Sequence, residues 1–362
     1  MTTTSAVFVI AEAGVNHNGR LDLALELVDT AARAGADAIK FQTFRAESLA
    51  TRSAAKAEYQ EKATGKAGSQ LDMLRALELD EEAHRKVVER CQERRIEFMS
   101  TPFDVDSVGL LTRLGVKRFK VPSGEIDNPL LLRAIAQQNT PVILSTGMAT
   151  LAEVEGALGI LTAAWLGQER PGKPGLGQGP ESLWSDRGKV LVAERVTLLH
   201  CTSLYPAPAE AVNLRAMQTM RDAFETRVGY SDHTLGVGVS AAAVALGATV
   251  IEKHFTLDRT MEGPDHKASL EPEELVSFVA MLRDVALSLG SARKMPTAAE
   301  VAMRAAARRS LVAATPIRKG EAFTAANVAL KRPGTGMSGR SYDALLGRTA
   351  SRDYAEDDLI KE

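Results

Sequence analysis

The sequence has almost no cysteine: Cys91 and Cys201 are the only two in 362 residues. Two thiols cannot build a disulfide framework, so a reducing compartment is expected and the cytoplasm is the predicted location. The N-terminus lacks the basic start of a signal peptide, and Glu12 interrupts its apolar run. No stretch approaches the roughly 18 apolar residues that span a bilayer, so no membrane partner is predicted.

A surplus of charge of one sign is also lacking. The formal net charge is -2, whereas proteins that bind nucleic acid usually carry a basic patch or stripe, so no nucleic-acid partner is predicted. The content of 45% hydrophobic and 25% charged residues is ordinary for a soluble globular protein. The length exceeds one average domain and suits a barrel of about 250 residues with a small extra domain.

What the sequence does contain is an alternation of β-branched runs and helical segments. Eight such runs begin at Val7, Ala38, Arg95, Arg118, Pro141, Val196, Thr226 and Thr249. Segments with helical periodicity separate most of them, and eight strand–helix units predict a (β/α)8 TIM barrel over residues 1–290. The runs end in polar residues, which in a barrel form the active-site face. A doubly wound sheet would also place polar residues at its strand ends. The sequence has no Gly-rich dinucleotide fingerprint, however, which favours a closed barrel over a doubly wound sheet.

Four segments depart from this alternation. Residues 45–70 are polar and long for a connection between strand and helix, which predicts a lid or a substrate-binding loop. Residues 165–189 contain PGKPGLGQGP and are expected to form a mobile surface insertion. Residues 291–307 are expected to be a linker with some helix. Residues 308–362 combine short strands with KGE and PGTG turns, which predicts a small β-rich domain that docks on another surface.

Two histidines, His233 and His254, end the seventh and eighth predicted strands. Neighbouring strands lie about 5 Å apart, so both imidazoles can reach one ion. Two imidazoles with oxygen ligands suit a first-row divalent metal such as Mn²⁺, and Glu12 can bind the ion or orient its water. The spacing fits equally well with two hydrogen-bonded histidines that face a cleft.

Two lysines, Lys40 and Lys120, end the second and fourth predicted strands. Each has three interpretations: a ligand of phosphate or carboxylate, a Schiff-base nucleophile, or a solvated residue of the rim. Hydroxyls near helix starts also bind anions, and Ser123, Ser145 and Ser203 occupy such positions. Together these residues predict an anionic substrate.

Other polar residues receive weaker interpretations. Glu125 and Asp265 can hydrogen-bond sugar hydroxyls or move protons. His17 is interpreted as a ligand or a structural residue, and His84 is expected on the surface of a helix. Cys201 is expected to be a small buried hydrophobic residue.

Several motifs occur in the same order in the sialic acid synthase family. They are AEAGVNHNG, IKFQTF, STPFD, FKVPSGE, ILSTGM, LHCTSLYP, GYSDHT and EKHFT…GPDH. The tail IRKGE…KRPGTG resembles the antifreeze-like (SAF) domain at that family's C-terminus. The similarity covers nearly the whole chain apart from residues 171–180, and AEYQ…SQLDMLRALEL resembles the bacterial branch of N-acetylneuraminate and legionaminate synthases.

The resemblance implies a role for each matching residue. His233 and His254 match the metal ligands, with Mn²⁺ expected first and Mg²⁺ or Co²⁺ as alternatives, and Glu12 matches the acid near the metal-bound water. The positions that hold phosphoenolpyruvate are matched by Lys40, Thr101, Lys120, Ser123, Ser145 and Ser231, with Ser203 where some relatives carry asparagine. The positions near the acceptor sugar are matched by Gln42, Glu125, Tyr205 and Asp265. Arg332 matches an arginine that reaches, in a domain-swapped homodimer, into the barrel of the other subunit.

The implied reaction condenses phosphoenolpyruvate with an open-chain N-acetylated amino sugar and water. The acceptor is N-acetylmannosamine or a 2,4-diacetamido-6-deoxy-mannose, and the products are a sialic-acid-type nonulosonate and phosphate, formed with C–O cleavage. Three alternatives stay open: a different aldose as acceptor, a Schiff-base aldolase, and a non-enzymatic carbohydrate-binding protein.

Overall fold

The computed structural model describes residues 7–56, 61, 69–168 and 180–362, and the structural statements below concern these residues. The chain forms two compact units, Met1–Gly290 and Ser291–Glu362, each of which is described by itself. The motif segment AEYQ falls on residues 57–60, which lie outside the described residues.

Eight parallel strands form the centre of the first unit. They are β1 (Phe8–Gly14), β2 (Ala38–Thr43), β3 (Glu97–Pro102), β4 (Phe119–Val121), β5 (Val142–Ser145), β6 (Val196–Cys201), β7 (Arg227–Asp232) and β8 (Val250–His254). The hydrogen-bonded order is β3-β2-β1-β8-β7-β6-β5-β4. The two end strands, β3 and β4, lie side by side, so the sheet closes on itself. The predicted TIM barrel is confirmed.

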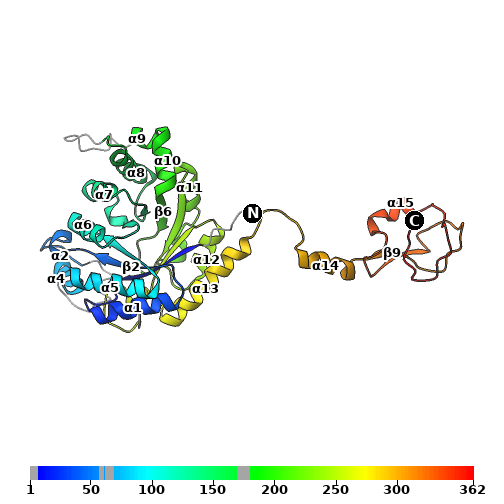
Figure 1. Ribbon diagram of the computed structural model, residues 1–362, viewed down its shortest axis with the longest axis horizontal. Coiled ribbons are helices and arrows are strands. Elements are labelled where there is room, and N and C mark those ends of the chain that lie inside the picture. The colour runs from blue at the N-terminus through cyan, green and yellow to red at the C-terminus, as the bar shows by residue number, and fades with distance from the viewer. Residues whose placement is uncertain (1–6, 57–60, 62–68, 169–179) are drawn as a thin grey trace. The chain divides into compact units, whose positions relative to one another are not determined.

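Helices cover the outer side of these strands (Figure 1). They are α1 (Leu21–Arg33), α5 (Glu81–Arg94), α6 (Val105–Arg113), α7 (Pro129–Ala136), α8 (Leu151–Trp165), α11 (Ala216–Phe224), α12 (Gly238–Ala245) and α13 (Pro272–Leu289). Short polar side chains set where several helices begin: Asp80, Asp104, Asn128 and Thr150 accept hydrogen bonds from the first turns of α5 to α8. The apolar faces of these helices pack on the outward side chains of the strands.

The inside of the barrel is apolar at mid-height. A separate core is formed by Ile10, Ala38, Met99, Ile143, Leu199 and Val250, with Phe8 packed against it. Because side chains alternate along a strand, residues two positions further on, such as Glu12 after Ile10 and Lys40 after Ala38, also point inward but one layer higher. The apolar layer therefore closes the barrel below the polar C-terminal ends of the strands, which we call the mouth.

The long connection after β2 folds onto the mouth. It contains α2 (Ala46–Leu49) and α4 (Gln70–Leu77), and residues 57–60 and 62–68 of it lie outside the described residues. Its apolar side chains form a small core of their own with the end of β1: Val15, Phe44, Ala46, Leu71, Leu74 and Leu77. The predicted loop at residues 45–70 is thus partly helical.

The insertion before β6 differs from its prediction. Residues 180–189 are helical, in α9 (Pro180–Trp184) and the start of α10 (Asp186–Arg195), and residues 169–179 lie outside the described residues. Ser185 caps α10 through the backbone N–H of Gly188. Trp184 donates a hydrogen bond to Glu155 on α8 (2.6 Å) and stacks on Phe224. The insertion predicted at residues 165–189 therefore contains helix in its described part, which these contacts hold against α8 and Phe224.

The second unit has its own core and little regular structure. It contains α14 (Ala298–Ala307), the antiparallel pair β9 (Ser310–Ala313) and β10 (Val328–Lys331), and α15 (Tyr342–Leu345). Its core consists of Leu311, Ala313, Ile317, Phe323, Val328, Leu345, Ala350, Tyr354 and Ile360. Across the two units, short 3-10 helices occur at Ser123–Glu125, Ala209–Ala211, His266–Ala268 and Gly339–Ser341. In the described part of the chain, no helix combines the length and apolar character that crossing a bilayer requires.

Candidate active site

A cavity of about 620 Å³ opens at the mouth of the barrel. Every site residue predicted within the barrel lines it: Glu12, Lys40, Gln42, Thr101, Lys120, Ser123, Glu125, Ser145, Ser203, Tyr205, Ser231, His233, His254 and Asp265. Arg332, the remaining predicted residue, belongs to the unit Ser291–Glu362, where its side chain is exposed and its Nε donates to the carbonyl of Ala307 (3.1 Å).

The strand register places the charged residues at the same height along the barrel axis. Glu12 on β1 pairs with Lys40 on β2 and with His254 on β8. Lys40 and Lys120 are both buried, with 3% of each exposed, so neither lysine is a solvated residue of the rim. That interpretation is excluded for both.

A buried carboxylate, Glu252, links the two lysines. The Nζ of Lys40 lies 3.7 Å from one Glu252 oxygen, and the Nζ of Lys120 lies 3.4 Å from the other. Lys40 also contacts Glu12 (2.8 Å) and donates to the hydroxyl of Thr101 (2.9 Å), while Ser231 donates to Glu252 (2.8 Å). The floor of the cavity is thus an alternating row of charges, Glu12–Lys40–Glu252–Lys120, which we call the charge row.

Burial and neighbouring charges shift the pKa values along this row. Burial raises the pKa of Glu12 to about 7, although Lys40 opposes the shift. For Glu252, burial also favours a higher pKa, but the ammonium groups of Lys120 and Lys40 outweigh it and hold the pKa low. Burial lowers the pKa of Lys120, and Glu252 opposes that shift. Glu252 therefore favours the charged form of Lys120 against the effect of burial.

Sequence reasoning missed Glu252. Its signal was present, because Glu252 and His254 are two residues apart on β8 and side chains two apart share one face of a strand. An inward His254 therefore implies an inward Glu252.

Hydroxyl groups and one backbone N–H line the side of the cavity near β4, β5 and β6. Ser123 Oγ accepts a hydrogen bond from the backbone N–H of Gly147 (2.9 Å) and lies 3.2 Å from the Sγ of Cys201. The hydroxyl of Ser145 is buried and has no hydrogen-bond partner among the described residues. A Cβ on Gly147 would lie 2.4 Å from Ser203 Oγ, so only glycine lets these groups approach one another. An unpaired buried donor beside two lysines suits an anionic ligand.

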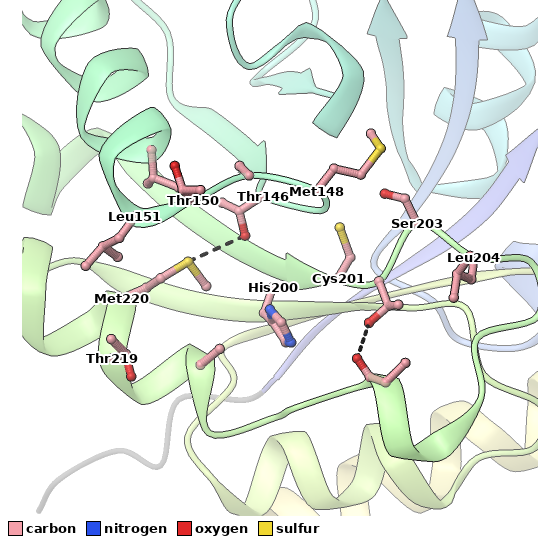
Figure 2. Close-up of a pocket in the computed structure, with 15 residues that line it drawn as sticks. Thr146, Met148, Thr150, Leu151, His200, Cys201, Ser203, Leu204, Thr219 and Met220 are labelled. Carbon is pink, nitrogen blue, oxygen red and sulfur yellow. Dashed lines mark hydrogen bonds between the residues drawn. The ribbon is translucent and has the colours of Figure 1, made fainter.

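A second cavity, of about 520 Å³, adjoins the mouth between β5, β6, α8 and α11 (Figure 2). Met148, Cys201 and Ser203 line both cavities. His200, which the sequence placed among the polar strand ends, lines only this second cavity, where its Nε2 donates to the carbonyl of Val212. It therefore does not contribute to the mouth.

The two predicted metal ligands face one another. The ring centroids of His233 and His254 are 5.6 Å apart. The Nδ1 of His233 donates to the carbonyl of Thr202 (2.7 Å), which leaves the Nε2 lone pair free to bind an ion. The Nδ1 of His254 is buried without a hydrogen-bond partner among the described residues. Since a metal–nitrogen bond is about 2 Å long, this pair fits one divalent ion.

No larger metal cluster accompanies this pair. Within residues 7–56, 61, 69–168 and 180–362, no three His, Cys, Asp or Glu side chains gather as a metal site. Two imidazoles alone leave most coordination positions open for oxygen atoms from water and substrate.

The residues predicted near the acceptor lie around the upper part of the cavity. Tyr205 packs on His233, with ring centroids 4.2 Å apart. Burial raises the pKa of Asp265 to about 6, although Lys40 opposes the shift. Glu125 is half-buried, which raises its pKa, and it accepts a hydrogen bond from Asn128 (2.6 Å). A raised pKa favours the protonated form of a carboxyl group, which can both donate to and accept from hydroxyl groups.

Two histidines outside the cavity have structural contacts. His84 is buried rather than on the surface, because its imidazole bonds to the hydroxyl of Thr43 (2.8 Å) and the carbonyl of Asp80 (2.9 Å). The prediction of a surface histidine is wrong for it. His17 is fully buried, and its Nδ1 accepts from the N–H of Gly19 (3.0 Å), which fits the structural interpretation.

The fold and the polar cavity at its mouth define a (β/α)8-barrel enzyme. The family model described as "NeuB family" matches residues 27–294, and the model described as "SAF domain" matches residues 308–362. The chain belongs to the NeuB family and is a carbon–carbon bond-forming transferase with a C-terminal SAF domain. The resemblance seen in the motifs is thereby confirmed, and a non-enzymatic carbohydrate-binding protein is excluded.

Relatives and solved structures agree with this assignment. The chain is 48% identical to the N,N'-diacetyllegionaminic acid synthase of Campylobacter jejuni, over 98% of each chain. It is 33% identical to the human N-acetylneuraminate-9-phosphate synthase, over 98% of this chain and 91% of the relative. The crystal structure of N-acetylneuraminic acid (sialic acid) synthetase from Leptospira borgpetersenii in complex with citrate is similar with a TM-score of 0.66 and 35% identity, over 83% of this chain and 90% of that one.

Proposed function

We propose that the protein condenses phosphoenolpyruvate with an open-chain N-acetylated amino sugar and water, to give a sialic-acid-type nonulosonate and phosphate. The observation that supports this most strongly is the cavity itself, in which the charge row and unpaired hydroxyls adjoin a facing pair of imidazoles. The names of the relatives agree, because each is a synthase of an acidic sugar of this kind.

Phosphoenolpyruvate binds at the lysines. Lys40 and Lys120 neutralise its charge, and the hydroxyls of Thr101, Ser123, Ser145, Ser203 and Ser231 orient its phosphate and carboxylate. The gain is mainly proximity, because the enol carbon is a weak nucleophile that must be held against the aldehyde. At Lys40 a Schiff base is disfavoured, because its two carboxylate neighbours outweigh burial and raise its pKa. Burial lowers the pKa of Lys120, so Lys120 is the lysine on which the Schiff-base alternative rests.

The acceptor aldehyde lies at the imidazole pair. His233 and His254 would hold a divalent cation, Mn²⁺ first and Mg²⁺ or Co²⁺ as alternatives, which supplies charge stabilisation at the aldehyde oxygen. Gln42, Glu125, Tyr205 and Asp265 line the cavity around this position and orient the sugar by hydrogen bonds.

The bond changes balance as follows. C3 of phosphoenolpyruvate forms a bond to the aldehyde carbon, whose oxygen takes up a proton, and positive charge develops at C2. Water adds to C2, and Glu12 accepts the proton that it loses, as a carboxylate with a pKa of about 7 can. The tetrahedral adduct then breaks its C2–O bond to phosphate, the C2 hydroxyl gives its proton to the leaving phosphate, and its oxygen becomes the ketone. The proton that Glu12 accepted replaces the one taken up by the aldehyde oxygen, so the two hydrogen atoms of water end on the new hydroxyl and on phosphate.

Phosphate release from phosphoenolpyruvate tests this proposal. We expect release with N-acetylmannosamine or 2,4-diacetamido-2,4,6-trideoxymannose, none with aldose phosphates, and loss of activity with a chelator that Mn²⁺ restores. Borohydride with pyruvate should trap no lysine. Chelator-resistant activity together with a trapped lysine would instead establish the Schiff-base aldolase.

We also propose that the protein acts in the cytoplasm as a domain-swapped homodimer. The described free thiols, Cys91 and Cys201, fit a reducing compartment. Arg332 is the exposed residue through which the SAF domain of one subunit would reach the N-acyl group in the other subunit's barrel.

The substitution Arg332→Ala is expected to raise the KM for the sugar about 10-fold to 100-fold and to leave the KM for phosphoenolpyruvate unchanged, because it removes a hydrogen bond to the acceptor alone. Arg340→Ala, which removes another exposed arginine of the same unit, is the control. Mixed dimers show whether Arg332 acts on the barrel of its own subunit or on that of the other subunit. Arg332→Ala and His254→Asn chains should restore activity together only if Arg332 acts on the other subunit. Equal loss for both substrates would contradict the assignment.

A further inference from the structure

A buried ion pair adjoins the two imidazoles without facing the cavity. The Nζ of Lys253 lies 3.0 Å from Oδ2 of Asp232, and the two side chains are 1% and 0% exposed. Neither residue lines the mouth cavity, although the residues before and after each of them in the chain do. The proposed reaction does not use these two charges. A buried ion pair is costly to form, so its presence here calls for a role.

The strand register places this ion pair next to the imidazoles. Asp232 on β7 pairs with Lys253 on β8. His233 directly follows the first of them, and His254 directly follows the second. Because successive side chains of a strand point to opposite faces, the imidazoles point into the barrel and the ion pair points outward. There Ser240 on α12 donates a hydrogen bond to Asp232 (2.6 Å).

Hydrogen bonds extend this link to the backbone around His233. Oδ1 of Asp232 accepts from the backbone N–H (2.8 Å) and from the hydroxyl (2.7 Å) of Thr234. The Nζ of Lys253 donates to the carbonyl of Thr234 (2.7 Å). Both chain neighbours of His233 are thus bound to Lys253, which is itself the residue before His254.

We propose that Asp232 and Lys253 are positioning residues, which fix the separation of the two imidazoles and thereby set the affinity for a divalent ion. This inference rests on the proposed function, which places the ion at that pair. Groups outside the ligand shell that orient metal ligands typically contribute 10-fold to 100-fold to metal affinity. The ion pair lies outside the cavity, so it acts through His233 and His254 and not on a substrate.

Charge alone predicts the opposite effect for Lys253→Met. An ammonium group repels a nearby divalent cation, so its removal by itself would tighten the binding of Mn²⁺. Loss of the link between β7 and β8 should instead raise the Kd for Mn²⁺ about 10-fold to 100-fold, measured by isothermal titration without substrates. The KM for phosphoenolpyruvate at saturating Mn²⁺ should stay within about 3-fold of wild type, because that substrate binds at other side chains.

Two further variants separate positioning from stability. Asp232→Asn combined with Lys253→Met leaves no unpaired buried charge, so its Tm should recover relative to Lys253→Met alone. Its affinity for Mn²⁺ should stay low, because the asparagine can still bind Thr234 but nothing joins it to β8. Thr234→Val removes one hydroxyl at nearly constant shape and should raise the Kd for Mn²⁺ about 3-fold, and it tests the proposal even where Lys253→Met does not fold.

Arg118→Met is the matched control. Arg118, directly before β4, forms an ion pair with Glu97 at the start of the neighbouring strand β3 (2.7 Å), at the opposite end of the barrel from the mouth. This variant should keep the wild-type Kd for Mn²⁺.

Four results would overturn the positioning role. They are a Kd for Mn²⁺ that Lys253→Met and Thr234→Val leave unchanged or lower, a Kd that recovers together with the Tm in the double variant, an equal loss of affinity in Arg118→Met, and an equal rise in the KM for phosphoenolpyruvate. In each of these cases a wild-type protein that binds Mn²⁺ leaves the proposed function intact. A wild-type protein that binds no divalent ion would overturn the metal site of the proposed function, and the positioning role with it.

Discussion

Replacing Glu252 by glutamine is expected to raise the KM for phosphoenolpyruvate about 100-fold at pH 8, a loss comparable to removing one preorganised donor from an active site. Glu252 lies between Lys40 and Lys120 and opposes the lowering of the Lys120 pKa by burial. Without the carboxylate, the repulsion between the two buried lysines is no longer offset, so the pKa of Lys120 falls further and its neutral form becomes more populated as the pH rises. Steady-state kinetics with phosphoenolpyruvate as the varied substrate measure the effect.

The sign of the pH dependence separates this explanation from a steric one. Lower pH favours the protonated form of Lys120, so the KM for phosphoenolpyruvate in Glu252→Gln should decrease when the pH is lowered from 8 to 6. If the substitution had instead misplaced the lysines, lowering the pH would not restore the KM. Glu125→Gln is the control, because Glu125 lines the same cavity and is half-buried, yet no contact joins it to either lysine in the described structure. Tighter binding of phosphoenolpyruvate by Glu252→Gln at every pH would contradict the prediction.

The positions of the site residues follow from strand periodicity to a large extent. An apolar run that ends in a polar residue marks the point where a barrel strand leaves the core, as Ile10 and Glu12 illustrate on β1. The same reasoning placed Lys40, Ser145 and His254 at the mouth, and the structure brings them into one cavity. Glu252 escaped notice because it is a charged residue within the run rather than at its end.

Other features depended on contacts between distant parts of the chain. His84 lies on a strongly polar helix, and nothing local indicates that Thr43 from β2 meets its imidazole. The helices at residues 180–195 were hidden by the adjacent Gly/Pro-rich stretch, although Leu183, Leu191 and Val192 are spaced to bury one face. Leu49 and Leu74 line the mouth cavity together with Phe103, although they lie in the connection after β2 and Phe103 follows β3. The local sequence pattern thus predicted how far along a strand a residue lies better than it predicted which distant residues it contacts.

The charge row also explains why the floor of the cavity can be both buried and highly charged. Each lysine has a carboxylate neighbour, so the cost of burying a charge is offset inside the row before substrate arrives. Neutralising phosphoenolpyruvate then requires that one carboxylate give up its charge or move away.

The substitution His254→Asn is expected to lower kcat at least 1000-fold and to abolish binding of Mn²⁺. An amide keeps the size and polarity of the side chain but is a much weaker ligand than imidazole, and one imidazole alone holds a divalent ion poorly. Charge stabilisation at the aldehyde oxygen is worth several kcal/mol in metal-assisted reactions, which corresponds to about three orders of magnitude in rate. Isothermal titration with Mn²⁺ and phosphate release measure the two effects.

His200→Asn provides the matched control for this experiment. His200 is half-buried at the end of β6, close to the mouth, but it lines the second cavity and bonds to the carbonyl of Val212. Its replacement should leave both Mn²⁺ binding and kcat within about 3-fold of wild type, because removing one peripheral hydrogen bond costs only about 1 kcal/mol. A His254→Asn protein that still turns over at the wild-type rate in the presence of chelator would show that the two imidazoles only hydrogen-bond within a cleft. The aldehyde would then need another electrophile, for which Lys120, which lines the same cavity, is a candidate.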